Sequence, residues 1–123
     1  MKYMILIYSN AASRKIWQEF SDAQRAEGLD WYAAFHDDLV NSGELIVSER
    51  LADPSLTTRV AVTEGQTMTT DGPFAEAKEL LAGFFLVEAD SHERAVEIAA
   101  RVPEAMLGLV EVRPVRDLRG LEM

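Results

Sequence analysis

KYMILIY at residues 2–8 and GFFLVEA at residues 83–89 decide the fold. Each is a nearly unbroken apolar run with large aliphatic or aromatic side chains at its centre. Runs of this kind are typical of strands that lie inside a sheet and are covered on both faces. We therefore expect both segments to be central strands of one sheet.

Two helical patterns follow these strands in the chain. Ser21, with a glutamine three residues later, forms a capping box, and the apolar spacing after it predicts a helix over residues 22–41. Asp90, with Glu93 as its box partner, predicts the start of a second helix that ends at Pro103. Each helix thus follows a strand.

The remaining strands are shorter or more polar. Residues 44–50 and 109–115 each read as a strand, and Pro114 predicts that the last strand ends or lies at a sheet edge. Residues 57–63 and 67–70 flank a turn and predict a short antiparallel hairpin.

The order of these elements predicts the fold class. Without the hairpin it is β-α-β-β-α-β, the order of a ferredoxin-like α+β fold in which both helices cover one face of an antiparallel sheet. The other face would stay bare, so we expect a homodimer that closes two sheets into a dimeric α/β barrel-like assembly. The whole chain, residues 1–123, is long enough for a single domain.

Composition excludes several classes of function. Twelve Lys and Arg against 21 Asp and Glu give a net charge of −9, and the basic residues do not cluster, which disfavours direct binding of nucleic acid. No cysteine is present and no apolar stretch approaches the roughly 20 residues of a membrane span, so we expect a cytoplasmic protein without membrane contact. Because the sequence has no glycine-rich phosphate loop and no HxH or HxxxH pair, we expect neither a cofactor nor a metal ion.

The stretch DGPFAEAKE, residues 71–79, is the densest polar group and is called the acidic loop below. Its Pro predicts a short helix over residues 75–80, which would put Glu76 and Glu79 on one face with Asp71 just before it. Carboxylates held together away from water can act as general acid and base, and Lys78 can anchor an anion. The alternative is structural: Asp71 makes a turn, Phe74 fills the core and the helix shows a charged face to water.

Other candidates are scattered along the chain. His36 follows Phe35 and is followed by two aspartates; it could serve as a base, or be a partly exposed helix residue whose protonated form the aspartates favour. Arg59 could bind a ligand carboxylate or simply charge a strand edge. Tyr3, Tyr8 and Tyr32 could orient an aromatic ligand with their hydroxyls, although Tyr32 also shares the helix face expected to pack into the core.

The segments MKYMILIY, DGPFAEAKE, GFFLVEA and VEVRPV, in this order over essentially the whole chain, resemble the DGPF branch of the YCII-related family. The resemblance implies the fold and dimer expected above, with a site in a cleft between subunits. Some relatives look like small enzymes acting on ring-cleavage or chlorinated aromatic intermediates, whereas members of the DGPF branch are associated with alternative sigma factors. Two functions follow: acid–base binding or conversion of a small anionic or aromatic metabolite near the acidic loop, or a regulatory module that binds a sigma factor. For the first, the expected catalytic residues are Asp71, Glu76, Glu79 and His36, and the expected ligand-binding residues are Lys78, Tyr32, Phe74 and Arg59.

The chain departs from the family pattern at one place. The resemblance implies a histidine early in the first long helix and an aspartate after the second, a suspected catalytic pair. Counting back eleven residues from Gly43 reaches Tyr32, and after the second helix no carboxylate precedes Glu104. His36 lies one turn beyond Tyr32, but the match does not transfer the role to it.

Overall fold

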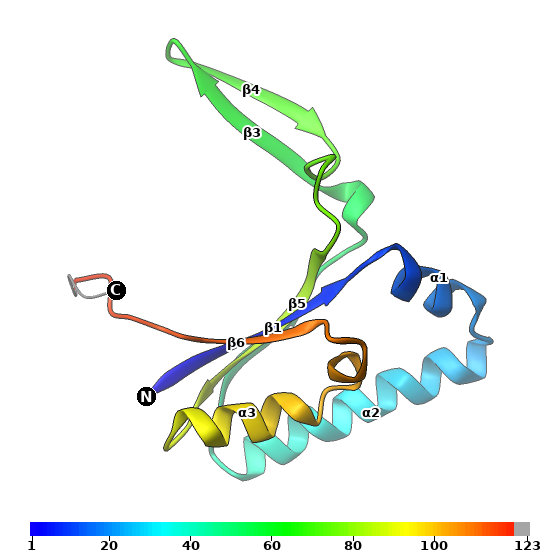
Figure 1. The fold of residues 1–123 in the computed structure, drawn as a ribbon, viewed down its shortest axis with the longest axis vertical. Coiled ribbons are helices and arrows are strands. Elements are labelled where there is room, and N and C mark those ends of the chain that lie inside the picture. The colour runs from blue at the N-terminus through cyan, green and yellow to red at the C-terminus, as the bar shows by residue number, and fades with distance from the viewer. Residues whose placement is uncertain (120–123) are drawn as a thin grey trace.

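The computed structural model describes residues 1–119 as an α+β protein with a four-stranded antiparallel sheet, helices on it and a separate hairpin (Figure 1). The elements in chain order are β1 (Lys2–Ser9), α1 (Ala11–Glu19), α2 (Asp22–Asn41), β2 (Leu45–Arg50), the 3₁₀ turn η1 (Pro54–Leu56), β3 (Thr58–Thr63), β4 (Gln66–Asp71), β5 (Leu80–Glu88), α3 (His92–Ala100), the 3₁₀ turn η2 (Pro103–Leu107) and β6 (Val110–Pro114).

The main sheet has the strand order β2-β5-β1-β6, and each neighbouring pair is antiparallel. β1 and β5 are therefore the central strands, as their apolar runs predicted. β6 lies at an edge and ends at Pro114, where the missing N–H of proline costs no ladder hydrogen bond.

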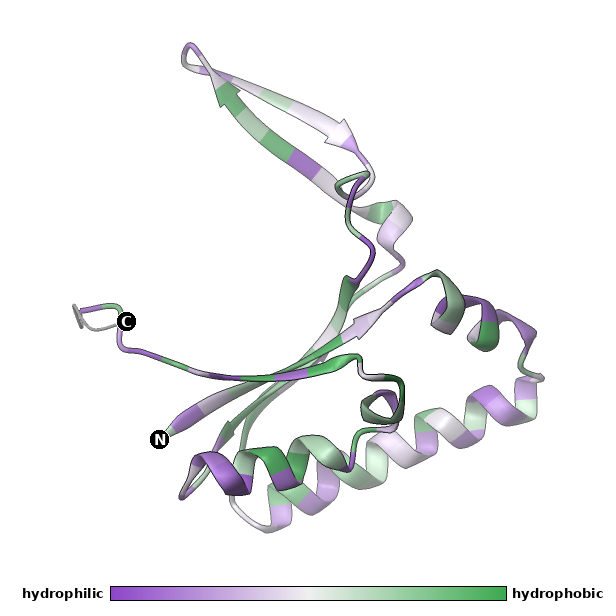
Figure 2. Ribbon diagram, viewed as in Figure 1, coloured by the Kyte–Doolittle hydropathy of each residue, from purple (hydrophilic) through white to green (hydrophobic). Residues whose placement is uncertain are grey.

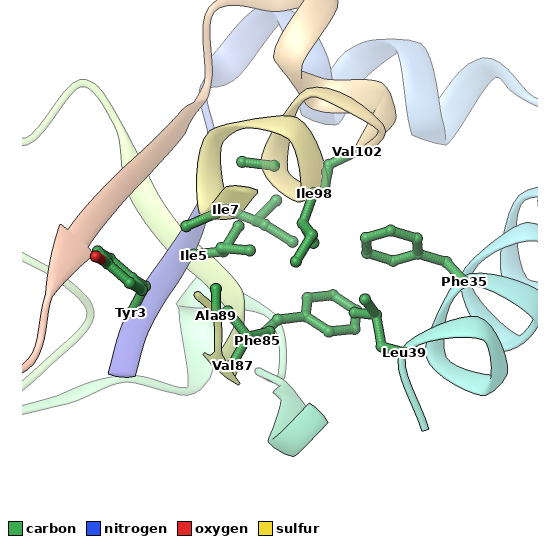
Figure 3. Close-up of a cluster of buried hydrophobic side chains, with 12 residues drawn as sticks. Tyr3, Ile5, Ile7, Phe35, Leu39, Phe85, Val87, Ala89, Ile98 and Val102 are labelled. Carbon is green, nitrogen blue, oxygen red and sulfur yellow. The ribbon is translucent and has the colours of Figure 1, made fainter. Parts of the chain in front are cut away.

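Helices α2 and α3 lie together on one face of the sheet (Figure 1). The apolar side chains of the two helices pack against alternate residues of the central strands. Figure 3 shows the buried side chains that helices and strands contribute to this core. Ile5 and Val87 from the sheet and Ile98 from α3 have no exposed surface. The ion pair of Glu44 with Arg94, at 2.9 Å, fixes the chain before β2 to α3.

The opposite face of the sheet, called the open face below, carries no helix or strand of the described residues (Figure 1). Strand alternation directs four apolar side chains to it, and each of them stays partly exposed: Met4, Leu6, Phe84 and Leu86. Ile46 and Val47 of β2 lie beside them at a bulge and are 45% and 38% exposed. The expected bare face is therefore present in the single chain.

Strands β3 and β4 form a two-stranded sheet of their own, and the hairpin projects from the body of the domain (Figure 1). Its turn residues Glu64 and Gly65 have φ of 52° and 75°, the left-handed pair of a two-residue type I′ turn. This connection matches the twist of the flanking strands, which explains why the predicted hairpin forms.

Three details correct the sequence predictions. The helix expected at residues 75–80 is wrong, because residues 72–79 form turns and bends and Leu80 already pairs with Ser9 in the sheet. The N-cap of α3 is Ser91 rather than Asp90, since its side chain accepts the N–H of Arg94. Helix α1 was not predicted, whereas α2 has the predicted bounds, residues 22–41.

Candidate functional site

The acidic loop connects the hairpin to β5. Asp71 ends β4 opposite Thr58, and the carboxylates of Asp71, Glu76 and Glu79 are all exposed. The loss of the expected helix removes the shared helix face of Glu76 and Glu79. In the single chain each of these carboxylates is therefore exposed to solvent, and they share no helix face.

The other predicted residues divide into two groups. Arg59 of β3 stacks on Phe74 of the acidic loop, with its guanidinium 5.5 Å from the ring centroid, and Lys78 is exposed nearby in the sequence. Phe74 is 67% exposed, so its alternative interpretation as a core residue is wrong. His36 is half-buried, and its Nδ1 lies 3.6 Å from the carboxylate of Asp37.

Two hollows have lining residues at the point where the acidic loop enters β5: Glu79 lines one of them and Leu80 the other. One, of about 260 Å³, has apolar walls that include Pro73, Leu80 and Leu81. The other, of about 330 Å³, is lined by five residues: Tyr8, Glu79, Gly108, Leu109 and Glu111. Leu81 is the strand partner of Tyr8, so the apolar and polar hollows are neighbours.

The polar hollow lies at the edge of the open face. Tyr8 follows Met4 and Leu6 in the alternation of β1, and Glu111 is the strand partner of Leu6. Hydrogen bonding to Glu111, with burial and the negative charge of that carboxylate, raises the pKa of Tyr8, while Arg113 opposes the shift. The phenol thus stays a hydrogen-bond donor toward Glu111, and Glu79 lines the same hollow.

A second polar pair lies on the helix side of the sheet. The hydroxyl of Tyr32, on α2, donates a hydrogen bond to the carboxylate of Glu104, on η2. Burial is the largest cause that raises the pKa of Tyr32 above its ordinary range, followed by the hydrogen bond to Glu104, and Arg50 lowers it. Tyr32 is the position reached by counting back eleven residues from Gly43, and Glu104 is the first carboxylate after α3. The structure joins these two residues by a hydrogen bond.

Aromatic rings surround Tyr32. Its ring lies 5.2 Å from Trp31 and 6.4 Å from Phe85, centroid to centroid, and Phe85 in turn contacts Phe35. Tyr32 therefore packs into the core with its ring and keeps its hydroxyl for Glu104. Sequence reasoning predicted the packing and missed the hydrogen bond, because nothing in a single sequence pairs residues that lie 72 positions apart.

Two searches of the described residues give limited findings. Among residues 1–119 no group of three or more histidines, aspartates and glutamates is arranged to hold a metal ion. Within the same range, no helix combines the length and the apolar character that crossing a membrane requires.

Comparison with known proteins gives two matches. The family model of the YCII-related domain matches residues 1–119. A protein of Rhizobium meliloti (strain 1021), named as the uncharacterized protein R00369, is 31% identical over 117 residues, which cover 94% of this chain and 92% of that protein.

Proposed function

The chain belongs to the YCII-related family, and from this premise we propose that it is a homodimer that binds or converts a small organic molecule in a hollow beside the acidic loop. The observation that carries the proposal is that residues adjacent in the chain, Glu79 on one side and Leu80 and Leu81 on the other, line a polar and an apolar hollow. A ligand with an apolar or aromatic body and a polar head fits such a pair, since most ligand sites combine apolar walls with a few placed polar groups.

The homodimer is supported by the open face. The apolar runs of β1 and β5 are those of strands covered on both faces, yet the helices cover only one. A second copy packed on the open face would supply the missing layer and produce the ferredoxin-like dimeric barrel expected from the sequence. The polar hollow lies at the edge of that face, so it would sit beside the seam of the two subunits.

The polar residues define the chemistry of the site. Glu79 and Glu111 are carboxylates that accept a proton or a hydrogen bond, and Tyr8 donates one. Two carboxylates favour a ligand head with hydroxyl or amine donors over an anionic head. Of the carboxylates proposed from the sequence, Glu79 is the one that lines the hollow, with Asp71, Glu76, Lys78 and the Arg59–Phe74 stack further along the loop and hairpin.

Ligand-induced thermal shift tests the site. A library of aromatic and alicyclic alcohols and amines is screened on the parent chain, and each hit is measured again on Glu79→Gln and Glu111→Gln. We expect both variants to lose most of the thermal shift. Glu76→Gln is the matched control, because it removes the same charge from an exposed position that lines neither hollow. Equal shifts in all four proteins would contradict the site.

The Tyr32–Glu104 pair is the competing location for the same chemistry. Tyr32→Phe removes the hydroxyl and keeps the ring packed, so it separates a chemical from a structural role. A hit whose shift disappears in Tyr32→Phe, but persists in Glu79→Gln, would move the site to the helix side of the sheet.

A regulatory module that binds an alternative sigma factor is the second candidate function. It is favoured by the exposure of the acidic loop, which presents Asp71, Glu76 and Glu79 to solvent as a docking surface would. A pull-down with the dimeric chain tests it. Recovery of a sigma factor by the parent, and its loss when the three carboxylates are replaced by amides, would support this function, and failure to recover any sigma factor would count against it.

A further inference from the structure

The β3–β4 hairpin, residues 58–71, is called the arm below. Each of its strand residues is exposed except Arg59, which is half-buried against Phe74. The two strands pair only with each other in the sheet topology. A two-stranded hairpin alone is marginally stable in water, so an arm that the body does not support needs contact with something else.

One face of the arm is apolar in a regular way. Strand pairing places Val60 and Val62 on the same face, opposite Thr69 and Thr67, and the two valines are 67% and 66% exposed. Figure 2 shows hydrophobic residues recurring along β3. Charged residues in the arm are limited to Arg59, Glu64 and Asp71, so residues 60–63 and 66–70 carry none of the charges that normally prevent edge association.

The chain exposes more surface than a compact monomer of the same mass. The chain exposes 9047 Å², whereas a compact monomer of 13.7 kDa exposes about 6,600 Å². The excess of roughly 2,400 Å² per chain is about three times the ~800 Å² that each partner buries in a standard interface. The open face and the arm both contribute to it.

We propose that the arm clasps a second copy of this chain, with its Val60–Val62 face packed against the partner subunit. The proposal rests on the homodimer proposed above and adds a second contact to it. The arm rises on the side of the sheet opposite the helices, which is the side of the open face (Figure 1). A partner seated on the open face would therefore lie beside the arm, and the two-fold axis would place its own arm beside the first body.

The dissociation constant of the dimer, measured by sedimentation equilibrium, tests the clasp. The double variant Val60→Ser/Val62→Ser removes apolar contacts from the proposed face, and we expect it to weaken the dimer about tenfold or more. The double variant Ala61→Ser/Met68→Ser is the matched control, because these residues are strand partners on the opposite face of the arm. We expect the control to change the dissociation constant less than about threefold.

Excision of the arm provides a second measurement that does not depend on side-chain choice. The N–H of Gly72 donates to the carbonyl of Thr57 at 2.7 Å, so residues 58–71 can be removed and the two ends joined. We expect the excised chain to keep its far-UV circular dichroism, apart from the lost strands, and to dimerise more weakly than either double variant.

Three results would overturn the clasp. The first is a dissociation constant that neither the valine pair nor the excision changes. The second is equal weakening by the valine pair and the control pair. The third is a parent chain that stays monomeric at all concentrations. Binding of lipid vesicles by the arm of such a monomer would identify a different occupant of the Val60–Val62 face.

Leu6→Glu separates failure of the clasp from failure of the homodimer. This variant places a charge on the open face. If it abolishes a dimer that arm excision leaves intact, the clasp is wrong and the proposed homodimer stands. A monomeric parent overturns both.

Discussion

The helix-covered sheet and the arm use the same kind of residue with opposite results. Val87 in β5 has no exposed surface, whereas Val60 and Val62 in β3 are two-thirds exposed. All three sit in antiparallel strands with apolar neighbours in the sequence. The difference is the second layer: α2 and α3 supply it for β5, and nothing in the described chain supplies it for β3. Burial therefore depends on what the chain provides to pack against, not on strand composition.

The largest effect is expected in the covered layer. Phe35→Ala removes a ring that is 1% exposed, lies 5.1 Å from the ring of Phe85 and is covered by the guanidinium of Arg101 at 4.9 Å. We expect the free energy of unfolding to fall by about 3–5 kcal/mol, since a cavity is left between two rigid layers. Urea unfolding at a fixed chain concentration measures it. A loss below about 1 kcal/mol would mean that this core is looser than its burial indicates.

Much of this covered layer could be predicted from the sequence. Residues 2–8 and 83–89 are long apolar runs, and the capping box at Ser21 defines α2 by local hydrogen bonds of Ser21 and Gln24. Such signals are local, so one sequence contains them. Helix α1 had a similar signal in the capping box of Asn10 and Ser13, but its short polar stretch has no buried residue to mark it as a helix.

The predictions from the sequence fail where tertiary contacts decide the structure. Pro73 favours a helix start, but residues 75–79 have no apolar face to bury, and Leu80 gains more as the first residue of β5. The polar hollow joins Tyr8, Glu79 and Glu111, which lie far apart in the sequence and meet only when β1, β5 and β6 pair. Predicting that site requires the strand register as well as the strands.

The Tyr32–Glu104 hydrogen bond is expected to contribute less than the core ring. In Tyr32→Phe the ring still packs beside Trp31 and Phe85. The lost hydroxyl leaves a partly exposed carboxylate that water can reach, so we expect a loss of about 1 kcal/mol in the free energy of unfolding. Tyr8→Phe is the matched variant near the end of the central strand β1. If its loss equals or exceeds that of Tyr32→Phe, the greater burial of Tyr32 does not strengthen its hydrogen bond.

The ion pair of Glu44, just before β2, with Arg94 of α3 makes the free energy of unfolding depend on pH. We expect its contribution to be no larger than that of the Tyr32–Glu104 hydrogen bond. Two hydrogen bonds from Arg94 are the main cause that lowers the pKa of Glu44 below its ordinary value of 4.5. A lowered pKa in the folded state means that the ionised form stabilises the fold above pH 4.5, and that this contribution is lost as the pH falls further. Because Arg94 is 38% exposed, we expect at most about 1 kcal/mol. Urea unfolding between pH 7 and pH 3 should show a smaller decline for Glu44→Gln than for the parent, and parallel declines would refute the assignment.

The smallest effect on the free energy of unfolding is expected for a substitution in the arm. This substitution tests most directly the difference between the arm and the helix-covered sheet. In the Leu6→Glu background, which removes the proposed dimer, Val62→Thr should change the free energy of unfolding by less than about 0.5 kcal/mol, because the side chain is 66% exposed and has no second layer to lose. In the parent background the same substitution should weaken the dimer, since there the partner supplies that layer. A large effect on the monomer would show that the arm packs on its own body, and the contrast between the arm and the covered sheet would then disappear.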